Sequence, residues 1–319
     1  MKIVRYTEKW RDAWDTFVRG SNNGTIFHLQ QFLDYHPPGR FHWHHLMFID
    51  KGQIAAILPG TLENGLFESP IGASYGGIIT PDIKFRQAME LISTLLEYGA
   101  KNGFKTIMLT PAPLIYEKYP NQNMEFAMLW QGFKYELHYI SSAICLDPSR
   151  EIIDRFQATV RRNIRKTLRD WDIRCEINER YDEFYPILVE NKARHHVRPT
   201  HSLEELIRLK ELLPESLKLF MVYLEDTPIG GSVMFFANDI TAICFYNMLR
   251  YDFAQYKPIH RVMYEVVKYC TEHGYRYVDI GVSQDTSADN PMTPSINLID
   301  FKEKFDAKTI MRNTLRIDL

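Results

Sequence analysis

Two segments of the chain repeat one order of secondary structure, and this repeat restricts the possible folds more than any other feature. The segment ELISTLLEYGAKNGFKTIMLT, which starts at Glu90, reads as a helix, a stop at Gly103 and a strand. The segment EVVKYCTEHGYRYVDIG, which starts at Glu265, reads in the same way around Gly274. Each glycine suits the left-handed position that follows a helix, and alternating strand residues come next.

A β-hairpin is predicted upstream of each helix. HHLMFIDKGQIAAILPG contains two strand-like runs around a turn at residues 50–52, and KLFMVYLEDTPIGGSVMFF repeats this order around residues 225–228. Each half of the chain thus contains a hairpin, a further strand, a helix and a strand. Self-similarity over so long a period indicates duplicated domains rather than a solenoid. A chain of 319 residues is long enough to form two hydrophobic cores.

An amphipathic helix with a basic face is predicted between the two halves. Its apolar residues recur at spacings of three and four, as on one side of a helix, and they are Ile153, Phe156, Val160, Ile164, Leu168 and Trp171. Residues 147–149, Asp-Pro-Ser, are typical of a helix start. We therefore place the domain boundary near residue 148, between an N-terminal domain of residues 1–148 and a C-terminal domain of residues 149–319.

The composition is that of a soluble globular protein. Hydrophobic residues make up 45% and charged residues 24% of the chain. A net charge of −2 argues against a positive potential over the whole molecule of the kind that attracts nucleic acid or a membrane surface. The N-terminus lacks the apolar core of a signal peptide, and no apolar run is long enough to cross a bilayer. These features predict a cytoplasmic protein without a transmembrane segment, and they leave the oligomeric state open.

Neither a disulfide nor a metal site is predicted. The four cysteines lie far apart, without a Cys-x-x-Cys pair, in apolar or strand-like contexts that are typical of reduced buried thiols. His42 and His44 share one face of a predicted strand at a spacing that can bind a metal, but no third ligand is evident. We expect no tightly bound cofactor.

The order of elements resembles that of a GNAT acyltransferase domain, in which helices precede a hairpin, a further strand, a crossover helix and a last strand. Two such domains in tandem, with a basic helix at their junction, resemble the FemABX peptidyltransferases. The segments that carry the resemblance are RRNIRKTLRDWDIRCEI, PTHSLEELIRL, PIGGSVMFF, HGYRYVDIGVS and IDFKEKFDAK. The resemblance implies an α/β fold with mixed sheets in two tandem GNAT-like domains, the acyl-CoA N-acyltransferase fold, and an active site in the second domain.

The resemblance also implies an enzyme that transfers an acyl or aminoacyl group to an amine. FemABX proteins take the group from aminoacyl-tRNA and extend the peptides of cell-wall (peptidoglycan) precursors. The usual Gln/Arg-x-x-Gly-x-Gly/Ala loop for acetyl-CoA is missing, because the corresponding place reads QYKPIHR. We expect aminoacyl-tRNA or another acyl carrier as cosubstrate and a small-molecule or peptide-bearing amine as acceptor. The alternatives are an enzyme that takes acyl-CoA or acyl carrier protein and acylates an amino sugar or lipid amine, and a non-catalytic binding module.

Lys302 and Asp279 are the candidate catalytic residues. Phe301 and Phe305 lie four apart and are expected to anchor one helical face to the sheet, which directs Lys302 sideways towards the strand YRYVDIGVS. FKEKF resembles the Phe-Lys pair near the FemABX active site, which implies that Lys302 stabilises an oxyanion or a phosphate. Asp279 and Ser283 share one face of that strand. Asp279 either accepts a proton from the amine or bonds neighbouring groups as a structural carboxylate.

Further residues are candidates for substrate binding, and they are Arg198, His201, Tyr246, Arg250, Lys257, His260, Ser283 and Phe301. Cations gather at a helix start marked by Pro258, where a phosphate is expected, and a solvated basic helix start is the alternative. In the fold that the resemblance implies, Arg198 and His201 border the acceptor groove, and packing of the loop is the alternative explanation for them. Tyr246 is a candidate for the acyl channel, and ordinary core packing explains it as well.

The basic face of the junction helix is a candidate for binding phosphates. Arg161 and Arg165 lie four apart on it, with Arg162 beside them. Such a ridge suits the phosphates of RNA or the diphosphate of a nucleotide- or lipid-linked acceptor. A solvated face paired with acidic neighbours is the alternative.

The expected reaction needs no covalent enzyme intermediate. The chain contains no recognisable Cys–His arrangement for a covalent nucleophile. We therefore expect direct attack of the amine on an activated donor. The polar loop that precedes FKEKF is expected to close over the substrate and exclude water.

Overall fold

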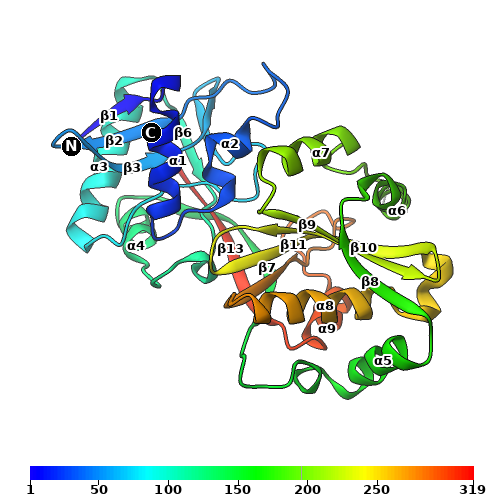
Figure 1. Cartoon of the computed structure of the whole chain (residues 1–319). Helices are drawn as coiled ribbons and strands as arrows, with labels where there is room; N and C mark the ends of the chain where they lie inside the picture. Colours follow the sequence, from blue (N-terminus) through cyan, green and yellow to red (C-terminus); the bar gives the residue numbers. More distant parts are fainter. Residues whose placement is uncertain (195) are drawn as a thin grey trace. The chain divides into compact units, whose positions relative to one another are not determined.

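The computed structural model describes residues 1–194 and 196–319. The chain forms two compact units, one of residues 1–139 with 311–319 and one of residues 140–310 (Figure 1). Each unit combines helices with mixed β-structure, which confirms the predicted α/β class. The division lies near residue 140 rather than at residue 148, and the C-terminal end belongs to the first unit.

The units end where they do because two long strands pass from one unit into the other. β7 (Lys134–Cys145) pairs over its last residues with β12 (Tyr277–Val282) of the second unit. β13 (Lys308–Asp318) pairs over its last residues with β6 (Thr106–Leu109) of the first unit. Strand pairing between distant parts of the chain, rather than a linker in the sequence, therefore sets the boundary.

The first unit contains two sheets. In chain order its other elements are β1 (Lys2–Arg5), the 3-10 helix η1 (Glu8–Trp10), α1 (Arg11–Gly20), η2 (Ile26–His28), α2 (Gln30–Leu33), β2 (Leu46–Asp50), β3 (Gln53–Leu58), β4 (Thr61–Glu63), β5 (Leu66–Ser69), α3 (Phe85–Lys101), η3 (Leu114–Tyr116) and α4 (Asn123–Trp130). One sheet has the order β1-β2-β3, and the strands β4-β5-β6-β13 lie side by side in the other. β5 and β6 are parallel, and α3 connects them.

The predicted hairpin and helix–strand pair are both present in the first unit. β2 and β3 are antiparallel, and Lys51 and Gly52 between them have φ angles of 48° and 84°. Gly103 follows the end of α3 with a φ of 77°, which only glycine adopts at little cost, and β6 begins three residues later.

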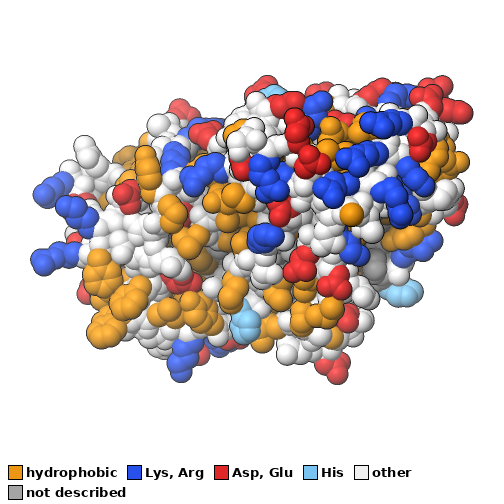
Figure 2. Space-filling view, turned by 90° about the horizontal axis from the view of Figure 1, so that it is seen from below, with side chains coloured by type: hydrophobic (Ala, Val, Ile, Leu, Met, Phe, Trp, Pro, Cys, Tyr) orange, Lys and Arg blue, Asp and Glu red, His pale blue; other side chains and the backbone are white. Residues whose placement is uncertain are grey.

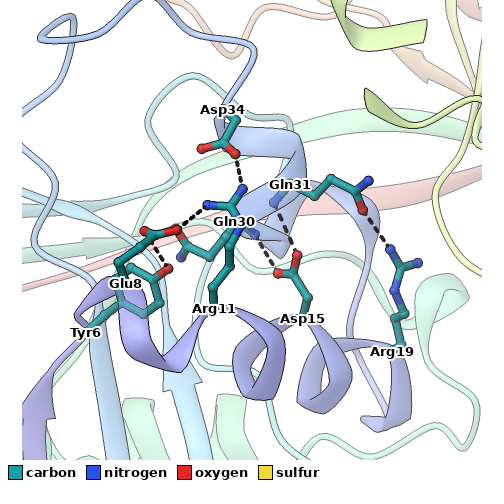
Figure 3. A network of polar contacts seen from close by, with 8 residues as sticks. All are labelled: Tyr6, Glu8, Arg11, Asp15, Arg19, Gln30, Gln31 and Asp34. Carbon is teal, nitrogen blue, oxygen red and sulfur yellow. Dashed lines mark hydrogen bonds and ion pairs between the residues drawn. The ribbon is translucent and has the colours of Figure 1, made fainter. Parts of the chain in front are cut away.

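A polar network holds α1 against α2 (Figure 3). The carboxylate of Asp15 accepts hydrogen bonds from the backbone N–H groups of Gln30 and Gln31, at 2.7 and 3.2 Å. Arg11 donates to Asp34 at the other end of α2. A helix of four residues is too short to be stable alone, so these contacts hold its ends. Burial raises the pKa of Asp15, while the two amides oppose that rise.

The second unit has one mixed sheet in the order β7-β12-β11-β10-β9-β8. In chain order its other elements are η4 (Ile152–Arg155), α5 (Ala158–Arg169), β8 (Ile173–Asn178), α6 (Tyr181–Ala193), α7 (Leu203–Leu212), β9 (Leu217–Leu224), β10 (Thr227–Phe236), β11 (Thr241–Leu249), η5 (Tyr251–Tyr256), α8 (Pro258–Glu272) and α9 (Ile296–Glu303). β11 and β12 are parallel, and α8, orange in Figure 1, connects them. Gly274 ends this connection with a φ of 79°, so the second helix–strand pair is also confirmed.

Other predicted elements of the second unit are present with changed ends. β9 and β10 form the second hairpin, but its turn is shorter than predicted, because residues 227–228 already belong to β10. α6 and α7 lie where two helices were expected. Ser202 caps α7, since its hydroxyl accepts a hydrogen bond from the backbone N–H of Glu205 at 3.2 Å.

The junction helix differs from its prediction at both ends. α5 begins at Ala158 rather than at residues 147–149, because residues 152–155 form a separate 3-10 turn. Val160 and Ile164 are buried as predicted, but Leu168 is 42% exposed. The predicted apolar face was therefore wrong at Leu168, because Thr167 takes the buried position in the last turn of the helix.

Candidate active site

The parallel strands β11 and β12 separate at their carboxyl ends, and a cavity lies there. They pair only over residues 241–243 and 277–279, although both strands continue further. The cavity has a volume of about 630 Å³, a usual size for a small-molecule site. The carboxyl ends of parallel strands are a common place for ligands. The polar residues that line the cavity are Asn191, Lys192, Cys244, Asn247, Tyr251, Lys257, His260 and Lys302.

The cavity is cationic. Three lysines line it, and none of the lining residues in the described ranges is acidic. The rest of the wall is largely apolar, with Met263 of α8, Ile280 of β12 and Phe301 of α9 among its residues. Charges act more strongly beside such apolar walls than in water, so the cavity favours anions and polarised acyl groups.

Lys302 is the most deeply buried lysine of this wall, with an exposure of 7%. Its ammonium donates to the carbonyl oxygens of Gly281 and Val282, at 2.7 and 2.9 Å. Phe301 and Phe305 pack edge to face, with ring centres 5.2 Å apart, and so anchor α9 as the spacing predicted. Burial lowers the pKa of Lys302 to about 8, although the carboxylate of Asp279 opposes the shift.

Asp279 is fully buried and is not among the residues that line the cavity. Its carboxylate accepts hydrogen bonds from the hydroxyl of Ser141 at 3.0 Å and from the backbone N–H of Gly281 at 2.8 Å. Gly281 has a φ of 78°, and the pairing of β12 with β7 is irregular here. Asp279 therefore holds the turn whose carbonyl groups receive Lys302. Ser283 is also fully buried and is absent from the cavity lining.

The start of α8 contributes two of the predicted residues to the cavity. Lys257 and His260 line it, whereas Arg250 does not. The imidazole Nε2 of His260 lies 3.2 Å from the amide Nδ2 of Asn163, and because an amide nitrogen donates, Nε2 accepts. Burial, with help from Lys257, lowers the pKa of His260 to about 4, so the ring is neutral at pH 7.

Three predicted acceptor-groove and acyl-channel residues lie away from the cavity lining. His201 and Tyr246 are buried and bond to each other, with 2.9 Å between the imidazole Nδ1 and the phenolic oxygen. They form a structural contact between the start of α7 and β11. Arg198 is exposed.

The polar loop of residues 283–295 is closed by backbone hydrogen bonds between its own two ends. The backbone N–H of Asp285 donates to Thr293 O at 2.8 Å, and that of Ser295 donates to Ser283 O at 2.8 Å. The loop thus ends where it begins and delivers the chain into α9. Its closure over a substrate stays a prediction.

The basic face of α5 is exposed. Arg162 and Arg165 have no acidic partner within residues 1–194 and 196–319, and Arg161 lies 3.8 Å from Asp154. Figure 2, a view from below, shows Lys and Arg side chains gathered on the part of the surface that α5 occupies. α5 also supplies Asn163, the partner of His260, and so connects this face to the cavity wall.

Sequence reasoning missed Lys192, Cys244 and Asn247, which all line the cavity. Lys192 lies on α6 and the other two on β11, so only the separation of two strands brings them to Lys302. The thiol of Cys244 is hydrogen-bonded to the Ser232 hydroxyl at 3.0 Å, and burial raises the pKa of this thiol to about 11. A thiol that stays protonated is a poor nucleophile.

The described part of the chain offers neither a cluster of metal ligands nor a membrane-spanning helix. No group of three or more His, Cys, Asp or Glu side chains there is arranged to hold a metal ion. No helix of the same residues has the length and apolar character needed to cross a membrane.

Comparisons with known proteins place this geometry in a known fold. The family model of the acetyltransferase (GNAT) domain matches residues 154–290, within the second unit. The solved structure of FemX has a TM-score of 0.73 at 13% identity and covers 100% of this chain and 98% of its own. L-PGS from Bacillus licheniformis has a TM-score of 0.59 at 8% identity, covering 97% and 91%. A tandem GNAT protein from the clavulanic acid biosynthesis pathway has a TM-score of 0.55 at 10% identity, covering 99% and 98%.

No curated protein matches the chain by sequence. Identities this low show a shared fold and carry no residue roles with them. The FemABX-like resemblance and the tandem GNAT-like fold predicted from the sequence are confirmed at that level. The chain therefore has the fold of FemX and of tandem GNAT proteins, and its residues 154–290 match the model of the acetyltransferase (GNAT) domain, in agreement with the predicted acyltransferase.

Proposed function

We propose that the protein is an N-acyltransferase that moves an acyl or aminoacyl group from an activated donor to an amine in the cavity of the second unit. The observation that carries this proposal is the Lys302 ammonium, which is buried in the cavity wall where β11 and β12 have separated. A preorganised cation in surroundings of low dielectric stabilises charge that develops on a reacting oxygen.

The chemistry follows from the two carbonyl groups that hold Lys302. They take two of the three N–H donors of its ammonium and leave one to face the substrate. The amine nitrogen attacks the carbonyl carbon of the donor, the carbonyl electron pair moves onto oxygen, and the ammonium stabilises that oxyanion. Loss of the ester oxygen or thioester sulfur restores the carbonyl, and the proton from nitrogen passes to the leaving group or to water. Asp279 serves by holding the turn at Gly281.

Aminoacyl-tRNA is the donor that we favour. The exposed Arg162 and Arg165 form a cationic face suited to an RNA backbone, and Asn163 on the same helix touches the cavity residue His260. Before α8 the chain forms the 3-10 helix η5 rather than a glycine-rich loop, so its backbone approaches a pyrophosphate less closely. Both observations support an RNA donor over CoA.

The acceptor that we propose is an amine of a cell-wall precursor peptide or a similar compound in the cytoplasm, as for the FemABX proteins that the sequence resembles. An enzyme that takes acyl-CoA or acyl carrier protein and modifies an amino sugar or lipid amine is the closest alternative. A binding module without catalysis is the alternative from another class.

A transfer assay with purified protein tests the proposal. Mixed aminoacyl-tRNAs and a set of acyl-CoA esters are offered with nucleotide-linked peptides, and products are identified by mass spectrometry. Lys302→Met should slow transfer by about 100-fold to 1,000-fold, whereas Lys304→Met, which removes an exposed lysine two residues away, should not. Transfer from CoA esters alone would favour the alternative donor. Binding of peptides without turnover under any condition would favour the binding module.

A further inference from the structure

Lys192 differs from Lys302 because no acceptor or carboxylate in the described part of the chain contacts its ammonium, and burial lowers its pKa without an opposing charge. Lys302 donates to two carbonyl oxygens. The ammonium of Lys192 has one recorded contact, with the ring of Tyr246, whose centre lies 5.9 Å away. Within residues 1–194 and 196–319 it has neither a carboxylate nor a hydrogen-bond acceptor.

An unpaired cation in such a place is costly for the folded protein. Lys192 is partly buried, and burial alone lowers the pKa of its side chain. The attraction between an ammonium and the face of an aromatic ring offsets only part of the free energy lost with its hydration. Partly buried charges are normally paired, so an unpaired one in a cavity wall points to a partner that arrives with the ligand.

The neighbours of Lys192 hold it at the cavity wall. The side-chain amide of Asn191 donates to Leu249 O at 2.6 Å and to Ile187 O at 2.7 Å, which ties α6 to the end of β11. Asn247 of β11 also lines the cavity, and its Oδ1 is buried without a hydrogen-bond partner in the described chain. Two polar side chains of one wall, Lys192 and Asn247, are thus left unsatisfied by the described part of the chain.

We propose that Lys192 is the anchor for an oxyanion, a carboxylate or phosphate group, on the molecule that occupies this cavity. Lys192 thereby selects anionic substrates, and Lys302 acts on the reacting carbonyl of the bound pair. The role of Lys192 in selecting substrates rests on the proposed acyl transfer, whereas the anion-binding site itself does not depend on that activity.

The test is direct binding of inorganic phosphate and of acetate to the protein with ¹³C in the lysine Cε positions. The Lys192 resonance is assigned from its loss in Lys192→Met. Either anion should raise the pKa of Lys192, and Lys192→Met should weaken binding of that anion about tenfold or more, as expected for a hydrogen bond to a charged group. Lys192→Arg should retain binding, which separates loss of charge from damage to the fold.

Lys218→Met is the matched control. Its ammonium also lies over a tyrosine ring, 5.8 Å from the centre of Tyr269, but Lys218 does not line the cavity. A response to phosphate alone would assign a phosphate-bearing substrate, and a response to acetate alone a carboxylate. The proposal is overturned if neither anion shifts the Lys192 resonance or if Lys192→Met binds both as well as the wild type does. If the anions bind but no acyl transfer is found, the anion site at Lys192 stands and the proposed acyltransferase activity is rejected.

Discussion

Replacing Lys302 with methionine should strongly reduce activity while changing the free energy of unfolding little at neutral pH. Burial lowers the pKa of this lysine from 10.5 to about 8. At about 1.4 kcal/mol for each pH unit between these values, keeping the charge costs about 3 kcal/mol of folding free energy. Methionine removes that cost but loses the hydrogen bonds to Gly281 and Val282, which contribute about 3 kcal/mol together. The two effects nearly cancel.

At high pH the two effects on the free energy of unfolding should no longer cancel, and the lowered pKa of Lys302 determines which protein becomes the more stable. Between about pH 8 and pH 10.5 the folded wild type has lost the Lys302 proton while the unfolded chain still holds it. Because the unfolded state then binds more protons, the wild type gains stability relative to Lys302→Met as the pH rises through this window. The gain should approach about 3 kcal/mol, the cost of keeping the charge at lower pH.

Urea unfolding followed by circular dichroism at pH 7 and pH 10 measures this difference, with Lys304→Met as the control. In parallel, kcat/KM for acyl transfer should fall about 100-fold to 1,000-fold in Lys302→Met. A stability difference that does not change with pH would refute the burial argument. Transfer by Lys302→Met at a rate near that of the wild type would refute the role of the ammonium.

Three further substitutions test the surroundings of the site and the fold. Gly281→Ala should lower stability by about 1 to 2 kcal/mol in urea unfolding and reduce transfer, because alanine is strained at a φ of 78° although its Cβ meets open space; an unchanged variant would show that the turn is not needed. Tyr246→Phe removes the hydrogen bond between the phenolic oxygen and Nδ1 of the buried His201 ring and should cost about 1 to 3 kcal/mol, measured by thermal unfolding, with KM unaffected; a large rise in KM would instead place Tyr246 at the substrate. Asp15→Ala removes the cap of α2 and should cost about 1 to 2 kcal/mol, with Asp15→Asn milder; equal stability of all three proteins would reject the capping role.

Those parts of the fold that depend on local chemistry could be predicted from the sequence. Gly103 and Gly274 end their helices because each takes a left-handed φ that other residues adopt only at a cost. Ser202 starts α7 because its hydroxyl satisfies a free amide of the first turn. The Phe301–Phe305 spacing was enough to place Lys302 at β12, since residues four apart share one helical face.

Predictions that needed the position of a distant segment were less accurate. The expected boundary at residue 148 differs from the observed division, because β7 pairs with a strand that begins more than a hundred residues later in the chain. The exposure of Leu168 depends on where α5 ends against the core rather than on its spacing. His201 and Tyr246 were candidates for substrate binding, with packing as the alternative, and in the structure they are hydrogen-bonded to each other.

The sequence by itself determined the repeated helix–strand units, the GNAT-like order of elements and the position of Lys302 beside the last strand, because each depends on neighbours within a few residues. Only the tertiary structure decided where β11 and β12 part and which side chains line the opening. The end of a strand ladder depends on backbone pairing across the sheet, and no local pattern of side chains encodes it. For that reason Lys192 and Asn247 became visible as parts of the site only once the chain was folded.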